Sequence, residues 1–390
     1  MTLPVRTSWP RVLAIYACGI GAGLQFAKVS VLFDALKAHY GAGAALTGWF
    51  VSAVGLVGVV FGATAGLIVA RVGFRQTLIV ALAGGAALSL IEATLPPAPL
   101  FIALRAAEGA AHLGIVVAAP TCLTGLAAPQ DRPLALGLWG TFMSVAFLIA
   151  GVVSHPLIGA FGLSAPFVAH AALMAVLAAA AWRVAPRMER ASAEPRGLVR
   201  QHVDLYADPR SGVPALCWLA YTGMYLAVQT LTPELAPAEI RPQMIVGMAF
   251  ISIFASLSAG ALAHRGFSPF ALSAGGFAAT LAASVVLQFA VGTGLIVPAA
   301  LLRMAFLSFL PGAILPMIPR LNRDSASQAR AFGAMAQTGN IGSALGPPVF
   351  AASEASLGSI GLLLPAVALS TLGFGLVVRA GRRLYSPGPR

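Results

Sequence analysis

Charged residues are scarce in this chain of 390 residues, since Asp, Glu, Lys and Arg together make up 9% and hydrophobic residues 58%. So little polar surface cannot coat a water-soluble globule of this length, which excludes a soluble domain. Cysteine is also scarce. Cys18, Cys122 and Cys217 lie in or beside apolar runs without metal or redox spacing, so no disulfide framework is indicated. A polytopic membrane protein is the remaining class.

Lysine occurs only at Lys28 and Lys37, against 22 arginines. The arginines form short blocks between apolar segments rather than a continuous basic domain, which argues against nucleic acid as a partner despite a pI near 10.8. His155 and His170 have no acidic neighbours at metal-ligand spacing, and no Gly, four residues, Gly-Lys-Ser/Thr loop occurs. No paired nucleophile and base is present either. We therefore expect no metal, no cofactor, no ATP site and no enzyme activity.

A helix that crosses a bilayer needs about 20 mainly apolar residues. The first apolar run is too long for the core of a signal peptide and has no obvious cleavage site, so we expect a retained first span. The sequence predicts twelve spans in an all-α membrane protein, at residues 12–33, 45–70, 76–95, 100–123, 134–153, 164–182, 213–231, 243–263, 270–291, 295–318, 331–352 and 358–378.

Basic residues fall on one side of these spans. With the N-terminus in the cytoplasm, 19 of the 24 basic residues lie in cytoplasmic segments, and only Lys37 and Arg241 lie on the opposite face. The positive-inside rule therefore predicts that both termini are cytoplasmic, and we expect a bacterial inner membrane protein. The other three basic residues lie within the predicted spans: Lys28, Arg105 and Arg303.

One long polar segment, residues 183–212, separates the sixth predicted span from the seventh. It divides the chain into an N-terminal six-helix bundle at 1–182 and a C-terminal one at 213–390. The halves resemble each other, because Arg105 and Arg303 are 198 residues apart, as are Arg132 and Arg330. Repeated halves in a helical membrane protein are typical of transporters.

Several motifs are those of a known family. GLIVARVGFRQ, after the second predicted span, resembles the signature of the major facilitator superfamily at Gly66, Arg71, Gly73 and Arg75, with Ala70 in the acidic position. LRAAEGAA in the fourth span resembles its Arg, two residues, Gln-Gly pattern, with Glu108 replacing the glutamine. GVVSHPLIG in the fifth span and GSALGPP in the eleventh are similar to its Gly-Pro motif, and His155 replaces a glycine in the first copy.

The resemblance implies secondary transport by two six-helix bundles that rock around a central cavity lined by the first, fourth, seventh and tenth spans. It also implies a gating role near the cytoplasmic face for the motif residues, and the Gly-Pro motif is associated in the family with exchangers and exporters, which favours export. Arg265, 194 residues after Arg71, belongs to the same predicted gate. The residues assigned to it are Gly66, Arg71, Gly73, Arg75 and Arg265.

The three intramembrane cations all fall on helices that the resemblance places around the cavity. A charge near the bilayer centre costs about 2.5–3.5 kcal/mol even on the lenient insertion scale, so such residues usually face water, a partner or a substrate. Three cations with one nearby acid, Glu108, leave a positive surplus. We therefore expect an anionic or zwitterionic substrate with a carboxylate, held by Arg105 and Arg303, because guanidinium groups bind carboxylates in bidentate fashion.

Structural roles remain open for the same residues. Arg105 could extend to the membrane surface, as could Lys28, which Asp34 could meet there. Glu108 lies three residues after Arg105 and could neutralise it as an intrahelical pair. In the seventh span, Trp218 and the residues Tyr221, Tyr225 and Gln229 share one helical face, which suits an organic ligand or ordinary packing equally well. Gln25 shares a face with Lys28 and is a further candidate for substrate binding.

Protons are the expected coupling ion, because Glu108, His112 and Lys28 can titrate. A lysine in an apolar setting can release its proton, whereas an arginine cannot. The expected partners are a small-molecule substrate, protons and the lipid bilayer, and we expect a monomer. Two alternatives remain: a multidrug or cation exporter by proton antiport centred on Glu108, and a membrane receptor that transports nothing.

Overall fold

The computed structural model describes residues 6–41, 44–186 and 198–384, and these ranges contain helices and no strand. The predicted all-α class is confirmed. The chain divides into two compact units that are each built from three stretches. Unit 1 takes residues 1–129, 142–196 and 324–337, and unit 2 takes 130–141, 197–323 and 338–390. Division of the chain at 183–212 stays a prediction of the sequence.

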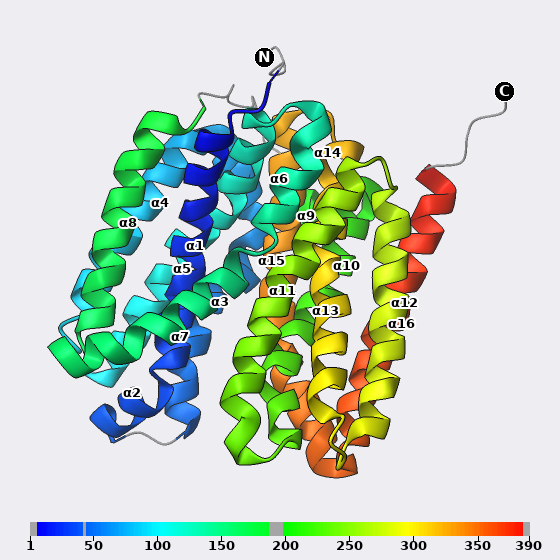
Figure 1. Ribbon diagram of the computed structural model, residues 1–390. Helices are drawn as coiled ribbons and strands as arrows, with labels where there is room; N and C mark the ends of the chain where they lie inside the picture. Colours follow the sequence, from blue (N-terminus) through cyan, green and yellow to red (C-terminus); the bar gives the residue numbers. More distant parts are fainter. Residues whose placement is uncertain (1–5, 42–43, 187–197, 385–390) are drawn as a thin grey trace, which may run out of the picture. The chain divides into compact units, whose positions relative to one another are not determined.

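Unit 1 is a bundle of long helices (Figure 1), in which α4 packs against α5 and α8, and α1 packs against α5, α7 and α8. The first part of α15 completes it. Its helices are α1 (Trp9–Val31), α2 (Phe33–Tyr40), α3 (Ala44–Val72), α4 (Phe74–Glu92), α5 (Ala98–Leu126), α7 (Phe142–Phe161), α8 (Ala165–Val184) and the start of α15 (Ser325–Leu357).

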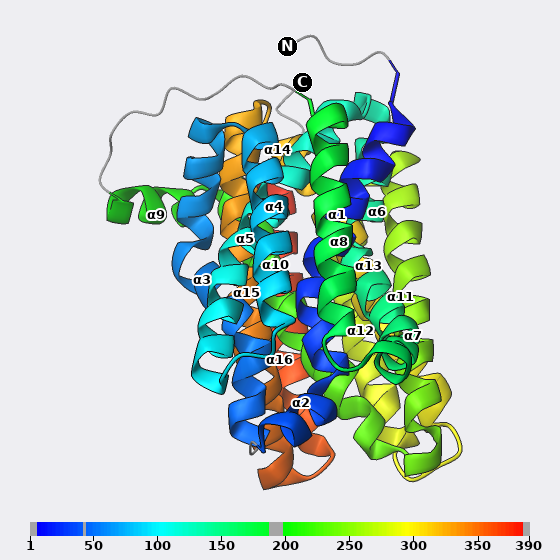
Figure 2. The ribbon, with the colours of Figure 1, turned by 90° about the vertical axis from the view of Figure 1, so that its left-hand side faces the viewer.

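Unit 2 is a second helical bundle, in which α13 packs against α10, α11 and α12, and α16 packs against α10 and α12. Short helices connect the long ones, and α9, labelled in Figure 2, directly precedes α10 in the chain and contacts it. Its helices are α6 (Arg132–Trp139), α9 (Leu198–Ala207), α10 (Pro209–Leu231), α11 (Arg241–His264), α12 (Pro269–Ala290), α13 (Ile296–Ile314), α14 (Met317–Leu321), the rest of α15 and α16 (Ile360–Leu384), with 3-10 turns η1 (Pro129–Asp131), η2 (Thr232–Leu235) and η3 (Ala238–Ile240).

The described helices include ten that are long and apolar enough to cross a membrane, or eleven if a bent pair in α3 counts as one span. That pair, Ala53–Gly62 and Thr64–Val72, is bent by 71°. The remaining predicted span, 331–352, lies within α15, which is helical but does not meet the same criterion. The protein is therefore a multi-span membrane protein, and twelve spans stay a prediction.

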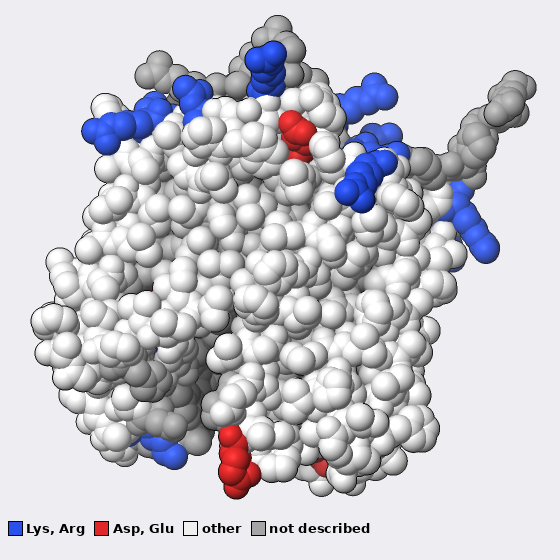
Figure 3. Space-filling model, in the orientation of Figure 1, with Lys and Arg blue, Asp and Glu red and all other residues white. Residues whose placement is uncertain are grey.

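The surface agrees with a lipid environment. Most of the face in Figure 3 carries no charged side chain. Large apolar side chains are exposed in both units, for example Phe161 at 76% and Phe289 at 80%. Exposed apolar surface on this scale is unfavourable in water and favourable against lipid chains.

Each unit contains one place where two helices approach closely at a pair of glycines. In unit 1, a Cβ added at Gly333 of α15 would lie 2.9 Å from the Cα of Gly66 in α3. In unit 2, a Cβ added at Gly137 of α6 would lie 2.8 Å from the Cα of Gly260 in α11. Gly260 is the residue that the sequence pairs with Gly66 at a separation of 194. The internal repeat of the sequence therefore corresponds to a repeat in helix packing, since small residues let two helix backbones approach closely.

We expect Gly260→Ala to destabilise the protein, because the new methyl group would contact both Gly137 and the carbonyl oxygen of Pro133. Overpacking of this kind costs about 1–3 kcal/mol. The matched control is Gly275→Ala in α12, where an added Cβ meets open space. Thermal unfolding in detergent should give a lower midpoint for Gly260→Ala than for the control, and equal midpoints would show that the crossing is loosely packed.

Candidate functional site

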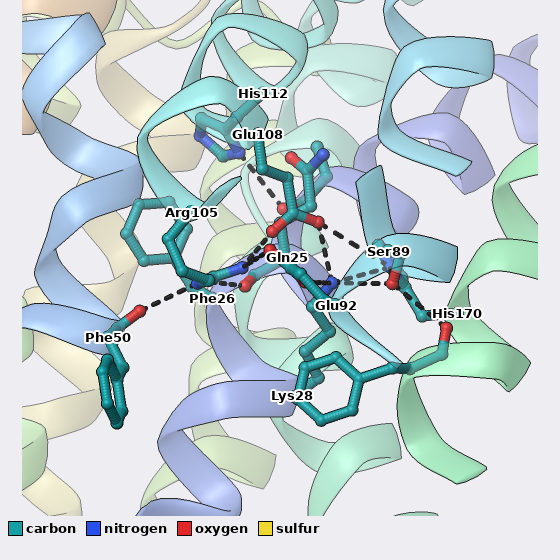
Figure 4. A network of polar contacts seen from close by, with 12 residues as sticks. Gln25, Phe26, Lys28, Phe50, Ser89, Glu92, Arg105, Glu108, His112 and His170 are labelled. Carbon is teal, nitrogen blue, oxygen red and sulfur yellow. Dashed lines mark hydrogen bonds and ion pairs between the residues drawn. The ribbon is translucent and has the colours of Figure 1, made fainter. Parts of the chain in front are cut away.

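The ammonium group of Lys28 lies at the centre of a buried polar network in unit 1 (Figure 4). Its Nζ is 2.8 Å from three oxygens: Oγ of Ser89, Oε1 of Glu108 and Oε2 of Glu92. Nδ1 of His170 is a fourth neighbour, at 3.2 Å. These groups come from α1, α4, α5 and α8, so four helices converge on one charge.

Arg105 of α5 makes the second half of the network. Its Nε donates to the carbonyl oxygen of Phe50 at 2.8 Å, and its Nη2 donates to the carbonyl oxygen of Gln25 at 2.6 Å. Its Nη1 contacts Oε2 of Glu108 and lies 3.6 Å from Oε1 of Glu92. The guanidinium is fully buried, and its three nitrogens all have acceptors.

Lys28, Glu92, Arg105 and Glu108 therefore form a closed charge ring, in which each carboxylate lies between the two cations. The positive surplus expected from the sequence around Lys28 and Arg105 is wrong for this unit, because Glu92 supplies a second carboxylate. The reason is physical: an unpaired buried charge costs several kcal/mol, so buried cations are usually matched by acids.

The side chains of Lys28 and Arg105 do not reach the membrane surface. Lys28 is 2% exposed and Arg105 is 0% exposed, and their charged groups point into the ring. The contact of Arg105 with Glu108 is the intrahelical pair that their spacing of three residues predicts. The side chain of Asp34 lies outside the described residues.

Two residues of the network, Glu92 and His170, are not among the site residues predicted from the sequence. Glu92 is the last residue of α4, and an acid near the end of a span attracts little attention. His170 has no acidic residue nearby in sequence, yet its Nδ1 lies 3.9 Å from Oε1 of Glu108. An intramembrane acid in the predicted span 76–95 was the available signal for Glu92, whereas nothing local pointed to His170.

His112 and Gln25 lie beside the ring. Nδ1 of His112 is 3.1 Å from the carbonyl oxygen of Ala22, and its ring meets Phe26 edge-on at 5.0 Å. A carbonyl oxygen only accepts, so Nδ1 carries the proton and Nε2 keeps its lone pair. The side-chain amide of Gln25 is buried, and neither of its polar atoms has a hydrogen-bond partner among the described residues.

The aromatic residues of α10 follow one another along a single face of that helix. Ring centroids of Trp218 and Tyr221 are 4.9 Å apart, and those of Tyr221 and Tyr225 are 5.5 Å apart. Gln229 continues the face and donates from Nε2 to the carbonyl oxygen of Ile245 at 3.2 Å. The ring contacts agree with the helical spacing in the sequence, while a role in substrate binding stays a prediction.

Arg303 of α13 differs from the cations of unit 1. It is 2% exposed, and neither its Nε nor its Nη2 has a hydrogen-bond partner within the part of the chain that the structure describes. A buried guanidinium without an acid is unfavourable unless another group supplies the acceptors. These two donors of Arg303 are therefore available to a group from outside the described residues.

Four of the five predicted gating residues lie at helix ends, whereas Gly66 lies within α3. Gly73 connects α3 to α4 with φ of 104°, a conformation that favours glycine. Arg75 donates to the carbonyl oxygen of Trp182 in the last turn of α8, which complements the negative end of that helix. Arg71 and Arg265 are exposed at the ends of α3 and α11. The side chain of His155, by contrast, lies outside the described residues.

A metal centre finds no support in the described residues, since no group of three or more His, Cys, Asp or Glu could hold an ion there. Cys18, Cys122 and Cys217 are free and buried. The candidate functional groups are the charge ring in unit 1 and Arg303 in unit 2.

A profile of the Major Facilitator Superfamily matches residues 15–347 of the chain. No match was found among curated proteins.

Solved structures of transporters share the fold. The human organic anion transporter MFSD10 (TETRAN) is 18% identical, with a TM-score of 0.77 over 95% of this chain and 100% of that one. The fucose:proton symporter FucP of E. coli is 19% identical, with a TM-score of 0.75 over 94% of this chain and 98% of that one. A structure of FucP in the outward conformation is 17% identical, with a TM-score of 0.77 over 95% and 98% of the two chains. At these identities the likeness concerns the fold alone.

Proposed function

The chain belongs to the Major Facilitator Superfamily, and on that premise we propose that it moves a small organic solute with a carboxylate group across the membrane by alternating access, coupled to protons. The family and the structural neighbours indicate transport rather than catalysis or signalling. The solute is anionic or zwitterionic, and Arg303 is the group that holds its carboxylate.

The observation that carries this proposal is the unpartnered guanidinium of Arg303. Its planar fork of N–H donors fits the two oxygens of a carboxylate, and charge-assisted hydrogen bonds of this kind are about twice as strong as neutral ones. Arg105 is already bonded through all three nitrogens. The proposal therefore gives Arg303 the direct contact and Arg105 a supporting place in the ring.

The aromatic face of α10 is a suitable wall for the rest of the solute. Arg303 lies seven residues after the start of α13, and Tyr225 six residues before the end of α10. With a rise of 1.5 Å per residue, both lie roughly 10 Å from those helix ends. Successive spans alternate in direction, and α10 packs against α13, so the two side chains have similar depth in unit 2. Tyr221 and Gln229 belong to the same wall.

Proton coupling is assigned to the network in unit 1 that contains Lys28, Glu108 and His112. It gathers titratable groups in a buried place, where uptake of one proton changes the local charge balance. Among the neighbours, FucP is a proton symporter and MFSD10 an organic anion transporter by title, which is compatible with this combination. A single-site cation exporter at Glu108 is less favourable, since both oxygens of Glu108 already contact cations.

Orientation and direction follow from the sequence. The arginine distribution supports cytoplasmic termini in a bacterial inner membrane, and the altered Gly-Pro motif in α7 supports export. The proposal treats the working unit as a monomer, because each chain supplies both bundles.

Flux in proteoliposomes tests the proposal. We expect purified protein to move labelled organic acids, aromatic carboxylates included, and to move them faster when a pH gradient is imposed. Cationic dyes should neither move nor compete. Liposomes without protein give the background. Transport of dyes but not acids would overturn the substrate class, and flux of acids that ignores the pH gradient would overturn the coupling.

A further inference from the structure

We propose that Glu92 and Glu108 together form the proton-binding group of this transporter, and that Lys28 is a fixed cation between them. The inference rests on the proposed proton-coupled transport, and it assigns the mobile proton to a pair of residues of which one, Glu92, has no role so far. It follows from the contacts of each titratable group in the charge ring, taken in turn.

Lys28 keeps its proton. Four acceptors surround its Nζ within 3.2 Å, and a charged ammonium group has three hydrogens to give them. A neutral amine would have only two hydrogens for these four neighbours, so it would leave more of them without a donor in a buried place. The ring of Phe167, whose centroid lies 5.3 Å from Nζ, adds a further interaction with the charged form.

His170 stays neutral while Lys28 is charged. Its Nε2 lies 3.0 Å from the carbonyl oxygen of Gly21, so Nε2 carries the hydrogen. Its Nδ1 then presents a lone pair to Nζ of Lys28 at 3.2 Å. A second proton on Nδ1 would point at the ammonium group, which like charges in a buried place oppose. His170 therefore positions Lys28 and carries no mobile proton itself.

The two carboxylates are left, since Arg105 does not release its proton. Glu92 and Glu108 each have an oxygen 2.8 Å from the same nitrogen, so they repel each other at close range, and a proton on either relieves the repulsion. Glu92 is the less firmly held, because its second oxygen is 3.6 Å from Arg105 and neither oxygen makes a well-directed hydrogen bond to a described residue. Such a pair titrates as a unit.

The surrounding helices add few other titratable groups. His112 of α5 faces the carbonyl oxygen of Ala22, and Tyr40 of α2 donates to the carbonyl oxygen of Pro96. Among the described residues, the charged and titratable groups whose contacts build the ring come from α1, α4, α5 and α8: Lys28, Glu92, Arg105, Glu108 and His170. The carboxylate pair is thus the place in this network where a proton is gained at least cost.

Uptake of a proton changes the ring from neutral to singly positive. A hydronium ion gives its proton to a carboxylate oxygen, one O–H bond forms, and water is left behind. The same bond breaks when the proton leaves to water on the other side. A positive ring attracts an anion more strongly than a neutral ring does, so binding of the proton and binding of a carboxylate solute influence each other. Loss of the proton makes the ring neutral again and removes its attraction for the anion.

Infrared spectra of the purified full-length protein during a pH titration, without substrate, test the proton site. We expect a carbonyl band of a protonated buried carboxyl group to appear on acidification in the wild type and to be lost in Glu92→Gln with Glu108→Gln. Each single variant should change the band. Glu239→Gln, the same chemical change at an exposed residue of η3, is the control and should leave it unchanged.

The pH profile of flux separates a proton-binding role from a structural one. Glu92→Gln should transport with lost pH dependence, and Glu92→Asp should restore it. The inference would be overturned if Glu92→Gln gave the same infrared titration and the same pH profile of flux as the wild type. A variant that only changed stability would keep the pH dependence of the wild type. If the band depends on Glu92 and Glu108 but no organic acid moves, the proton site stands and the proposed substrate class fails.

Discussion

Arg303→Met is expected to abolish binding of organic anions and, at the same time, to raise the thermal stability of the empty protein. The buried guanidinium has unpartnered Nε and Nη2 groups, and the penalty for burying such a charge is several kcal/mol. An apolar side chain of similar length removes that penalty. It also removes the charge-assisted hydrogen bonds to the solute, worth about 1.5–3 kcal/mol each. Two bonds lost would weaken binding by at least about 100-fold.

Isothermal titration and thermal unfolding measure the two effects separately. Arg303→Lys keeps the charge but loses the planar fork, so we expect weakened yet measurable binding. Arg379→Met, the same change at an exposed position of α16, should alter neither quantity. Unchanged anion affinity in Arg303→Met would show that another group holds the carboxylate. A large loss of stability would show that Arg303 is paired within the protein.

The helices were predictable from the sequence because apolar length is a local property. A backbone inside lipid has to satisfy its own hydrogen bonds, so each long apolar run forms a helix. The ends of the helices were harder to predict where small residues allow the helix to break. The predicted span 134–153 is two helices, α6 and α7, separated at Gly140 and Thr141, and α15 begins at Ser325 rather than near 331.

The site was predictable only in part, for a related reason. Arg105 and Glu108 share a helix face, and that contact follows from their spacing. The partners of Lys28 lie 61, 80 and 142 residues away in the chain, at Ser89, Glu108 and His170. Such contacts depend on how helices pack, which periodicity in one sequence does not encode. Counting charges in the sequence predicted a positive surplus, because it took Glu108 as the one nearby acid and did not identify Glu92.

Lys28→Met is expected to destabilise the protein strongly, and addition of Glu92→Gln is expected to recover much of the loss. Without Lys28 the ring has one cation and two carboxylates, and removal of one partner from a buried ion pair costs about 3–5 kcal/mol. The second change returns the ring to neutrality and keeps the contact between Arg105 and Glu108. The double variant should therefore unfold at a higher temperature than Lys28→Met alone.

A double-mutant cycle on thermal unfolding gives the coupling between Lys28 and Glu92, which we expect at about 1–3 kcal/mol. Lys28→Arg tests geometry at constant charge, because a planar fork cannot place one nitrogen 2.8 Å from three oxygens at once. It should be less stable than the wild type but more stable than Lys28→Met. Additive losses in the double variant would contradict the shared ring, and full stability of Lys28→Arg would mean that charge alone, without the contact geometry, is what the buried lysine supplies.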